Sequence, residues 1–107
     1  MQIVEYLTTD EQSPFANWFD ALDPFAATKV TVALARLAAG NISNVKGVGG
    51  GVLEQRIDFG PGYRTYFARD GETVVVLLAG GTKRRQQADV DRALMRWHDY
   101  KNRKKRT

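Results

Sequence analysis

The chain has 107 residues, of which 43% are hydrophobic and 26% charged, and its formal net charge is +4. This composition is typical of one globular domain and excludes a fibrous or disordered chain. There is no cysteine, which excludes a disulfide framework, a cysteine-based zinc site and a thiol nucleophile. The longest apolar stretch, residues 74–79, is too short to cross a bilayer, and residues 1–15 carry acids where a signal peptide needs Lys or Arg. We therefore expect a cytoplasmic protein without a membrane partner.

The first half of the chain predicts one strand and two helices. Residues 2–8 are rich in β-branched and aromatic types, which favour a strand. Ser13-Pro14 and Asp23-Pro24 are helix-start signals, and each precedes apolar residues at helical spacing, the second run ending at Gly40. We expect these helices to form an αα-hairpin. Residues 41–51 are rich in Gly and Asn and follow a helix instead of a strand, which predicts a flexible connector and not a nucleotide-binding loop.

Three strands and a helix are predicted in the second half. The strands are Val52–Phe59, Tyr63–Arg69 and Thr73–Ala79, joined by tight turns. Residues 74–78 are apolar at every position, which indicates a central strand covered on both faces. An apolar stripe then predicts a helix over residues 86–100. The order β-α-α-β-β-β-α gives an α+β fold over residues 1–100. Its four-stranded, antiparallel-rich sheet would be packed by the helical hairpin and the C-terminal helix, and a flexible basic tail would follow at 101–107.

Charge is distributed unevenly along the chain. Residues 1–45 hold two basic and five acidic residues, a net −3, whereas residues 46–107 hold fourteen basic and seven acidic residues, a net +7. Such asymmetry indicates a polyanionic partner for the second half. The alternative is an ordinary domain with a basic tail. The five cations of residues 101–106 do not account for the whole excess, because the rest of that half keeps a net +2.

The strand pattern brings several charged residues to one face of the sheet. Alternation places Glu54, Arg56 and Asp58 opposite the apolar residues of their strand, and Arg64 and Tyr66 opposite those of the next strand. We expect Arg56, Arg64 and Tyr66 to converge on an open sheet face. The basic run of residues 82–87 leads into the final helix, and a helix N-terminus beside cations favours a phosphate. The alternative is a solvated surface, in which Arg56 pairs with Glu54 or Asp58, and Arg64 with Glu72.

Three blocks carry a resemblance to a known family: LEQRIDFGPGYRTYF at 53–67, VVVLLAGGTKRRQ at 74–86 and DVDRALMRWHDY at 89–100. In this order and spacing they resemble the RelE/HigB-type toxins of bacterial type II toxin-antitoxin systems, within the RelE/ParE superfamily, and especially the subgroup of phage-derived or addiction-module killer proteins. The resemblance implies cleavage of mRNA, commonly on the translating ribosome, and no metal or other cofactor. It also implies neutralisation by a cognate antitoxin, which we expect to be a small helix-turn-helix protein.

The resemblance also suggests roles for residues. Arg56, Arg64 and Lys83 match the basic positions that supply charge to the transition state. The residues expected to contact RNA are Lys46, Tyr66, Arg84, Arg85, Lys101, Arg103 and Lys104. Glu54 is a candidate general base, because Arg56 on the same face could keep it ionised, or else it is simply the salt-bridge partner of Arg56. His98, the single histidine, could transfer a proton or could be a bystander on the helix surface.

Two alternatives to the nuclease remain open at this point. A ParE-like toxin shares the fold but poisons DNA gyrase, and a catalytically inactive relative would only bind RNA. Residues 86–90 lack the tyrosine that some RelE-type toxins use, which favours the inactive relative, whereas Arg56, Arg64 and Lys83 favour the nuclease. If Arg64 projects from an open face, truncating it to alanine should abolish toxicity and spare the fold.

Overall fold

The computed structural model describes residues 1–106. Its elements in chain order are β1 (Gln2–Glu5), α1 (Pro14–Asp20), α2 (Pro24–Ala38), β2 (Val45–Gly49), β3 (Val52–Ile57), β4 (Tyr63–Asp70), β5 (Val74–Thr82), the short 3₁₀ turn η1 (Lys83–Arg85) and α3 (Gln86–Lys105). The α+β fold expected from the sequence is confirmed. Within these residues no helix is both long enough and apolar enough to span a membrane.

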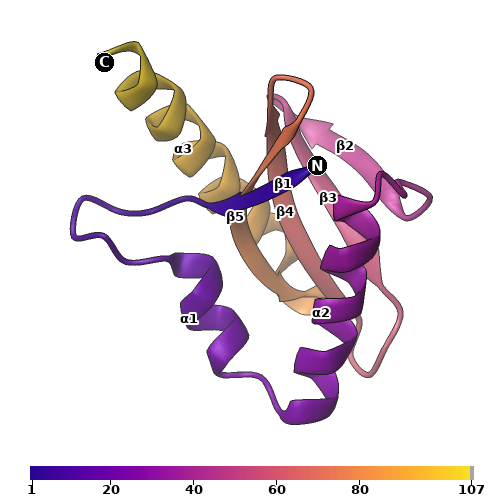
Figure 1. Ribbon diagram of the computed structural model, residues 1–107. Helices are drawn as coiled ribbons and strands as arrows, with labels where there is room; N and C mark the ends of the chain where they lie inside the picture. The colour runs from indigo at the N-terminus through magenta and orange to yellow at the C-terminus, as the bar shows by residue number, and fades with distance from the viewer. Residues whose placement is uncertain (107) are drawn as a thin grey trace.

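One sheet separates the helices into two layers. Within residues 1–106 it has five strands in the order β1-β5-β4-β3-β2, in which β1 is parallel to β5 and the other neighbours are antiparallel. Figure 1 shows α1 and α2 on one side of the sheet and α3 on the other. Strand β5 lies between β1 and β4, and residues 75–79 are buried, as the continuous apolar run predicts.

Both N-terminal helices begin where the capping signals indicate. The Ser13 side chain accepts a hydrogen bond from the Ala16 N–H, and Asp23 accepts from the N–H groups of Phe25 and Ala26. Pro24 opens α2 because its fixed φ suits a first helical position, where no backbone donor is required. These caps satisfy backbone groups that would otherwise lack a partner, and they fix where α1 and α2 begin.

Each face of the sheet has its own core. Phe15 of α1 and Val30 and Leu37 of α2 pack on Phe67 and Leu77 of the sheet. On the opposite face, α3 contributes the buried stripe Val90, Ala93 and Trp97, which packs on residues that include Val52, Tyr66, Val76 and Leu78. The N-terminal helices and α3 therefore bury opposite faces of the same strands.

The expected connector at residues 41–51 contains a strand, and the sheet has five strands where four were predicted. Residues 45–49 form β2, which pairs with the outer edge of β3. Gly49, Gly50 and Gly51 have positive φ and make the tight turn into β3. A Cβ on Gly50 would lie 2.5 Å from Leu94 of α3, so this turn closely approaches the helix. Strand β2 could not be predicted from the sequence, because its glycines give no alternating pattern of polar and apolar residues. It becomes a strand by pairing with β3.

The predicted tail is helical through Lys105. Helix α3 continues beyond the predicted end at residue 100, and its last turn carries Arg103, Lys104 and Lys105. Cations near the C-terminus of a helix interact favourably with the helix dipole, which explains why a basic run can extend the helix. Residue 107, the end of the predicted tail, lies outside the described residues.

Candidate active site

Three strands bring the predicted site residues into register. Lys46 of β2 is opposite Glu54 of β3, which in turn is opposite Tyr66 of β4. In the next row of this face, Arg56 is opposite Arg64. Because side chains alternate along a strand, all five project from the face that α3 packs against. The structure thus confirms the shared face that alternation predicts.

That face is not open, as the sequence suggested. Glu54 and Tyr66 are completely buried, and Arg64 is only 8% exposed. Helix α3 begins immediately after β5 and η1, where its first residue Gln86 binds Glu54, and its buried stripe packs in the same core as Tyr66. Arg56, nearer the end of β3, stays exposed. The expected convergence of Arg56, Arg64 and Tyr66 on an open surface is therefore wrong, because Arg64 and Tyr66 are buried and Arg56 alone of the three is exposed.

Glu54 connects three elements through its carboxylate. Its Oε1 lies 3.5 Å from Nε of Arg64 on β4 and 3.7 Å from Nζ of Lys46 on β2. Its Oε2 accepts a 2.8 Å hydrogen bond from Nε2 of Gln86, the first residue of α3. The partners proposed from the sequence were different, since Glu54 was matched with Arg56 and Arg64 with Glu72. Glu54 instead holds two of the predicted site cations together.

The turn between β3 and β4 places Lys83 next to Arg64. The carbonyl oxygen of Gly62 accepts a 2.9 Å hydrogen bond from the backbone N–H of Lys83 and a longer 3.5 Å contact from Nη1 of Arg64. Gly62 has a φ of 81°, a conformation that glycine adopts without strain. A Cβ at this position would lie 3.6 Å from Arg64 Nη1 and 3.8 Å from the Lys83 Cβ, so both residues lie against this turn.

Exposed cations surround the buried carboxylate. Lys46, Lys83, Arg84 and Arg85 are all exposed. A groove between β2 and the beginning of α3 is lined by Val48, Lys83, Arg84, Gln86, Gln87, Val90 and Leu94. Gln86 lines this groove and also binds Glu54, so its side chain lies between the groove and the buried carboxylate and is bonded to the carboxylate. Positive side chains beside a helix N-terminus are well suited to bind phosphate.

Buried polar atoms without hydrogen-bond partners are concentrated beneath this groove. Within residues 1–106 they include Glu54 Oε1, Arg64 Nε, Tyr66 OH and Asp89 Oδ2. Burial raises the pKa of Tyr66, and the charge of Glu54 raises it further. Burial also raises the pKa of Asp89, while Arg92, whose Nη1 lies 3.2 Å from Asp89 Oδ1, acts in the opposite direction. Glu54 Oε1 and Arg64 Nε form an ion pair without hydrogen-bond geometry, and buried polar atoms without hydrogen bonds are costly, so the cluster is a candidate functional site.

Gln86 and Asp89 belong to this cluster as well, although the sequence did not identify either as a site residue. Gln86 was included only in the basic run leading into the helix. Asp89 lies four residues before Ala93, so it occupies the buried face of α3, and its residue exposure is 7%. An acid inside an apolar helical stripe is the signal that could have identified it, because such residues are rarely buried without a specific partner.

The C-terminal residues expected to bind RNA lie at the other end of α3. From Gln86 to Lys101 the helix rises about 22 Å, at about 1.5 Å per residue. Lys101 lies over the Trp97 ring, with its Nζ 5.3 Å from the ring centroid. Lys104 pairs with Asp70, which also accepts a hydrogen bond from Tyr100. Burial and this bond raise the pKa of Tyr100 to about 12.

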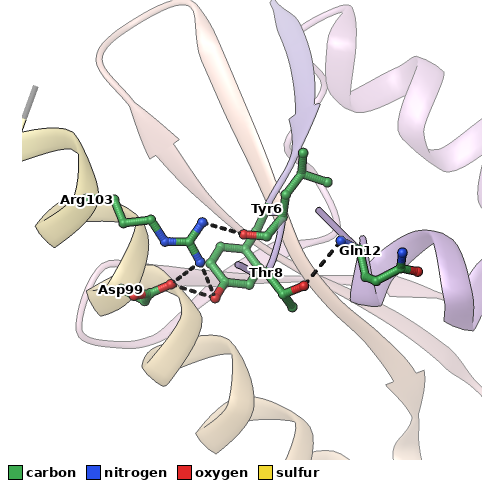
Figure 2. A network of polar contacts seen from close by, with 6 residues as sticks. Tyr6, Thr8, Gln12, Asp99 and Arg103 are labelled. Atoms are coloured by element: carbon green, nitrogen blue, oxygen red, sulfur yellow. Dashed lines mark hydrogen bonds and ion pairs between the residues drawn. The ribbon is translucent and has the colours of Figure 1, made fainter. Parts of the chain in front are cut away.

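Arg103 is engaged within the chain. Figure 2 shows its guanidinium beside Asp99 and Tyr6, and it also donates to the Leu7 carbonyl oxygen. The Tyr6 hydroxyl donates a 2.7 Å hydrogen bond to Asp99. This network ties the end of α3 to the segment that follows β1. His98 lies on the exposed side of the same helix, where its Nε2 is 3.0 Å from the Asn102 amide nitrogen.

Comparison with known proteins places the chain in a family. The model of the family described as Phage derived protein Gp49-like (DUF891) matches residues 17–97. The chain belongs to the Gp49-like family. This family is of the RelE-like toxin type. A relative from Haemophilus influenzae (strain ATCC 51907 / DSM 11121 / KW20 / Rd), described as an uncharacterized protein, is 38% identical over 80 residues, which is 74% of this chain and 81% of the relative.

The family match includes the candidate site and excludes the end of α3. All the residues around Glu54, from Lys46 on β2 to Asp89 on α3, lie within the matched range of this Gp49-like chain. Lys101, Arg103 and Lys104 lie beyond it. Among the described residues, no three His, Asp or Glu side chains are grouped so that they could hold a metal ion.

Proposed function

We propose that this Gp49-like protein is the toxin of a type II toxin-antitoxin system, of the HigB/RelE kind, and that it inhibits translation by cleaving mRNA on the ribosome. The observation that supports this most directly is the position of Glu54, a completely buried carboxylate between Lys46 and Arg64 beneath an exposed basic groove. A cytoplasmic toxin of this type needs a neutralising partner. We propose a cognate antitoxin, a small helix-turn-helix protein.

The proposed reaction needs no metal or other cofactor. The 2′-hydroxyl of the RNA gives its proton to water and attacks the adjacent phosphorus, the bond from phosphorus to the 5′-oxygen breaks, and the departing 5′-oxygen takes a proton from water. The products are a 2′,3′-cyclic phosphate and a 5′-hydroxyl, and negative charge develops on the phosphoryl oxygens in between. Arg64, Lys83 and Lys46 stabilise that charge, an effect that typically contributes a factor of about 10² to 10³ in rate per donor. Arg56 approaches from the exposed end of β3. We propose that Arg84 and Arg85 bind neighbouring phosphates.

Glu54 acts in this proposal as a positioning residue. Because it is completely buried, RNA cannot reach its carboxylate in this conformation, which argues against the general-base role considered from the sequence. Its contacts with Lys46 and Arg64 hold one exposed and one buried cation on either side of the carboxylate, and Gln86 connects it to the groove. Tyr66, which is equally buried, would support Glu54 from below and would not contact RNA.

The test is induced expression without antitoxin, comparing the parent with Lys83→Ala. Lys83 is exposed, so its truncation should leave stability within about 0.5 kcal/mol of the parent, while message cleavage falls by a factor of about 10². Lys105→Ala, an exposed cation at the far end of α3, is the matched control and should remain toxic. Amino-acid and thymidine incorporation and the mapping of message ends are the measurements.

Two outcomes would contradict the proposal. If DNA synthesis stops first while message stays intact, the protein is a gyrase-poisoning toxin of the ParE kind. If the protein neither cleaves message nor arrests growth but still binds RNA, it is a catalytically inactive relative.

A further inference from the structure

A second basic groove leads from the candidate active site around the end of β3. Its first part is lined by Lys46 and Arg56 together with Ser43, Asn44 and Asp58. Its second part, between α2 and β3, is lined by residues that include Lys29, Arg36 and Arg56. Asn44, Arg56 and Asp58 line both parts, so the two are continuous, and the groove begins at Lys46, which is 3.7 Å from Glu54.

The charges in this groove are unusual for their place in the chain. Residues 1–45 have a net charge of −3 and contain two cations, Lys29 and Arg36. Both are exposed, and both line the groove. They lie seven residues apart, two helical turns, and so share one side of α2. Both basic side chains of this acidic part of the chain therefore lie on the surface of the groove.

These cations are available to an outside ligand. In the part of the chain that the structure describes, none of Lys29, Arg36 and Arg56 forms an ion pair with a carboxylate. Lys29 lies over the Phe59 ring, with Nζ 5.5 Å from its centroid, and this contact leaves its three donors unpaired. Asp58 is the single carboxylate among the lining residues of the two parts, against four cations. The groove keeps a clear positive excess.

We propose that this groove, through Lys29, Arg36 and Arg56, binds backbone phosphates of an RNA strand that passes through the candidate active site. The inference rests on the proposed function only in taking RNA as the polyanion. Side chains of Ser43, Asn44 and Thr28 line the groove and supply hydroxyl and amide groups, which suit phosphate oxygens and ribose hydroxyls. The continuity with Lys46 favours one strand running from α2 to Lys46 over a separate acidic protein segment.

The test compares two double variants that each remove two positive charges. Lys29→Gln with Arg36→Gln changes the groove, and Lys105→Gln with Arg106→Gln, exposed cations at the end of α3, is the matched control. Binding to a short 2′-O-methyl RNA, which lacks the attacking hydroxyl, is measured over a range of salt concentrations. The groove variant should bind about tenfold more weakly, and the slope of log K against log salt should fall by about 1.4, since each phosphate contact contributes about 0.7 for single strands. The control should keep the slope of the parent.

A second measurement separates the sources of the phosphates. If the groove variant loses ribosome binding but keeps its affinity for the short RNA, the phosphates are those of ribosomal RNA and not of a strand in the active site, which would overturn the proposal. Equal losses in both double variants would show only a general charge effect and would overturn the proposal. Loss of antitoxin binding with unchanged RNA binding would also overturn it, since the groove would then be a protein interface. A protein that binds the short RNA through the groove but cleaves nothing would uphold this inference and refute the nuclease.

Discussion

The candidate site depends on one residue, Glu54, and on its buried carboxylate. It is surrounded by Lys46, Arg64 and Gln86, and it has no exposed surface of its own. Lys46 is largely exposed, with 58% of its side-chain surface accessible, whereas Arg64 has 9%. A buried charge is tolerated only when its partner is also held in place. Arg64 is therefore a structural residue as well as a proposed functional one.

Truncation of Arg64 should destabilise the protein, contrary to the expectation from the sequence. Arg64→Ala leaves Glu54 buried without its closest cation, and removing one partner of a buried pair typically costs about 3 to 5 kcal/mol. We expect the free energy of unfolding to fall by about 3 kcal/mol, measured by urea denaturation. Glu54→Leu combined with Arg64→Met, which replaces the pair by apolar residues, should recover most of this loss without restoring toxicity.

A parent-like urea midpoint for Arg64→Ala would contradict this assignment.

The sequence could not predict the burial, although alternation correctly placed Glu54, Arg64 and Tyr66 on one face. Which face a helix covers depends on the path that the chain takes after β5, and no local pattern encodes that path.

Strand β5 lies between two helices that approach it unusually closely. A Cβ on Gly80 would lie 2.1 Å from the Trp18 ring of α1, and a Cβ on Gly81 would lie 1.9 Å from Oδ2 of Asp89 on α3. The two glycines face opposite layers, because side chains alternate along a strand. Neither has a positive φ, so glycine is required at both positions by space and not by backbone conformation.

Gly81→Ala should displace the beginning of α3. The added methyl group must push Asp89 away, and overpacking of this kind typically costs about 1 to 3 kcal/mol. Asp89→Ala in the same chain should recover part of the loss. The measurement is urea unfolding, with Gly47→Ala as the control, since a Cβ there meets nothing within 4 Å. Equal midpoints for Gly81→Ala and Gly47→Ala would show that α3 can move without cost.

The elements differ in how far the sequence predicted them. The boundaries of α1 and α2 follow from Ser13 and Asp23, because capping is a local interaction. Strand β2 could not be predicted, since its glycines carry no alternation and only the edge of β3 makes it a strand. The last turn of α3 could not be predicted either. The favourable charges of that turn are local, but Arg103 also binds Tyr6 and Leu7, which are far away in the sequence.

At the scale of the whole molecule, two aspartates connect stability to pH. Hydrogen bonds from Lys104 and Tyr100 lower the pKa of Asp70, and hydrogen bonds from Tyr6 and Arg103 lower that of Asp99. A carboxylate whose pKa is lowered by folding contributes stability above its unfolded pKa, and this contribution is lost as the pH falls through the folded pKa. Asp89 acts in the opposite direction, because burial raises its pKa.

We expect Asp70→Asn with Asp99→Asn to flatten the acid side of the stability profile. The double variant should be less stable than the parent at neutral pH, and the difference should shrink as the pH falls below the ordinary aspartate pKa of 3.8. The midpoint of thermal unfolding at a series of pH values is the measurement. Asp10→Asn, at an exposed loop position, is the control and should follow the parent curve. A constant difference at all pH values would show that the two ionised carboxylates do not contribute.

The parallel pairing of β1 with β5 has a consequence for the order in which the protein forms during synthesis. Gln2 is in register with Val74 and Glu5 with Leu77, so β1 has no partner strand until more than seventy residues have been made. Strands β2, β3 and β4 pair locally and can form earlier. Gln86 arrives later still and places the last contact on Glu54. A nascent chain therefore acquires Lys46, Glu54 and Arg64 well before the candidate site can close, and that site remains incomplete until Gln86 has been added.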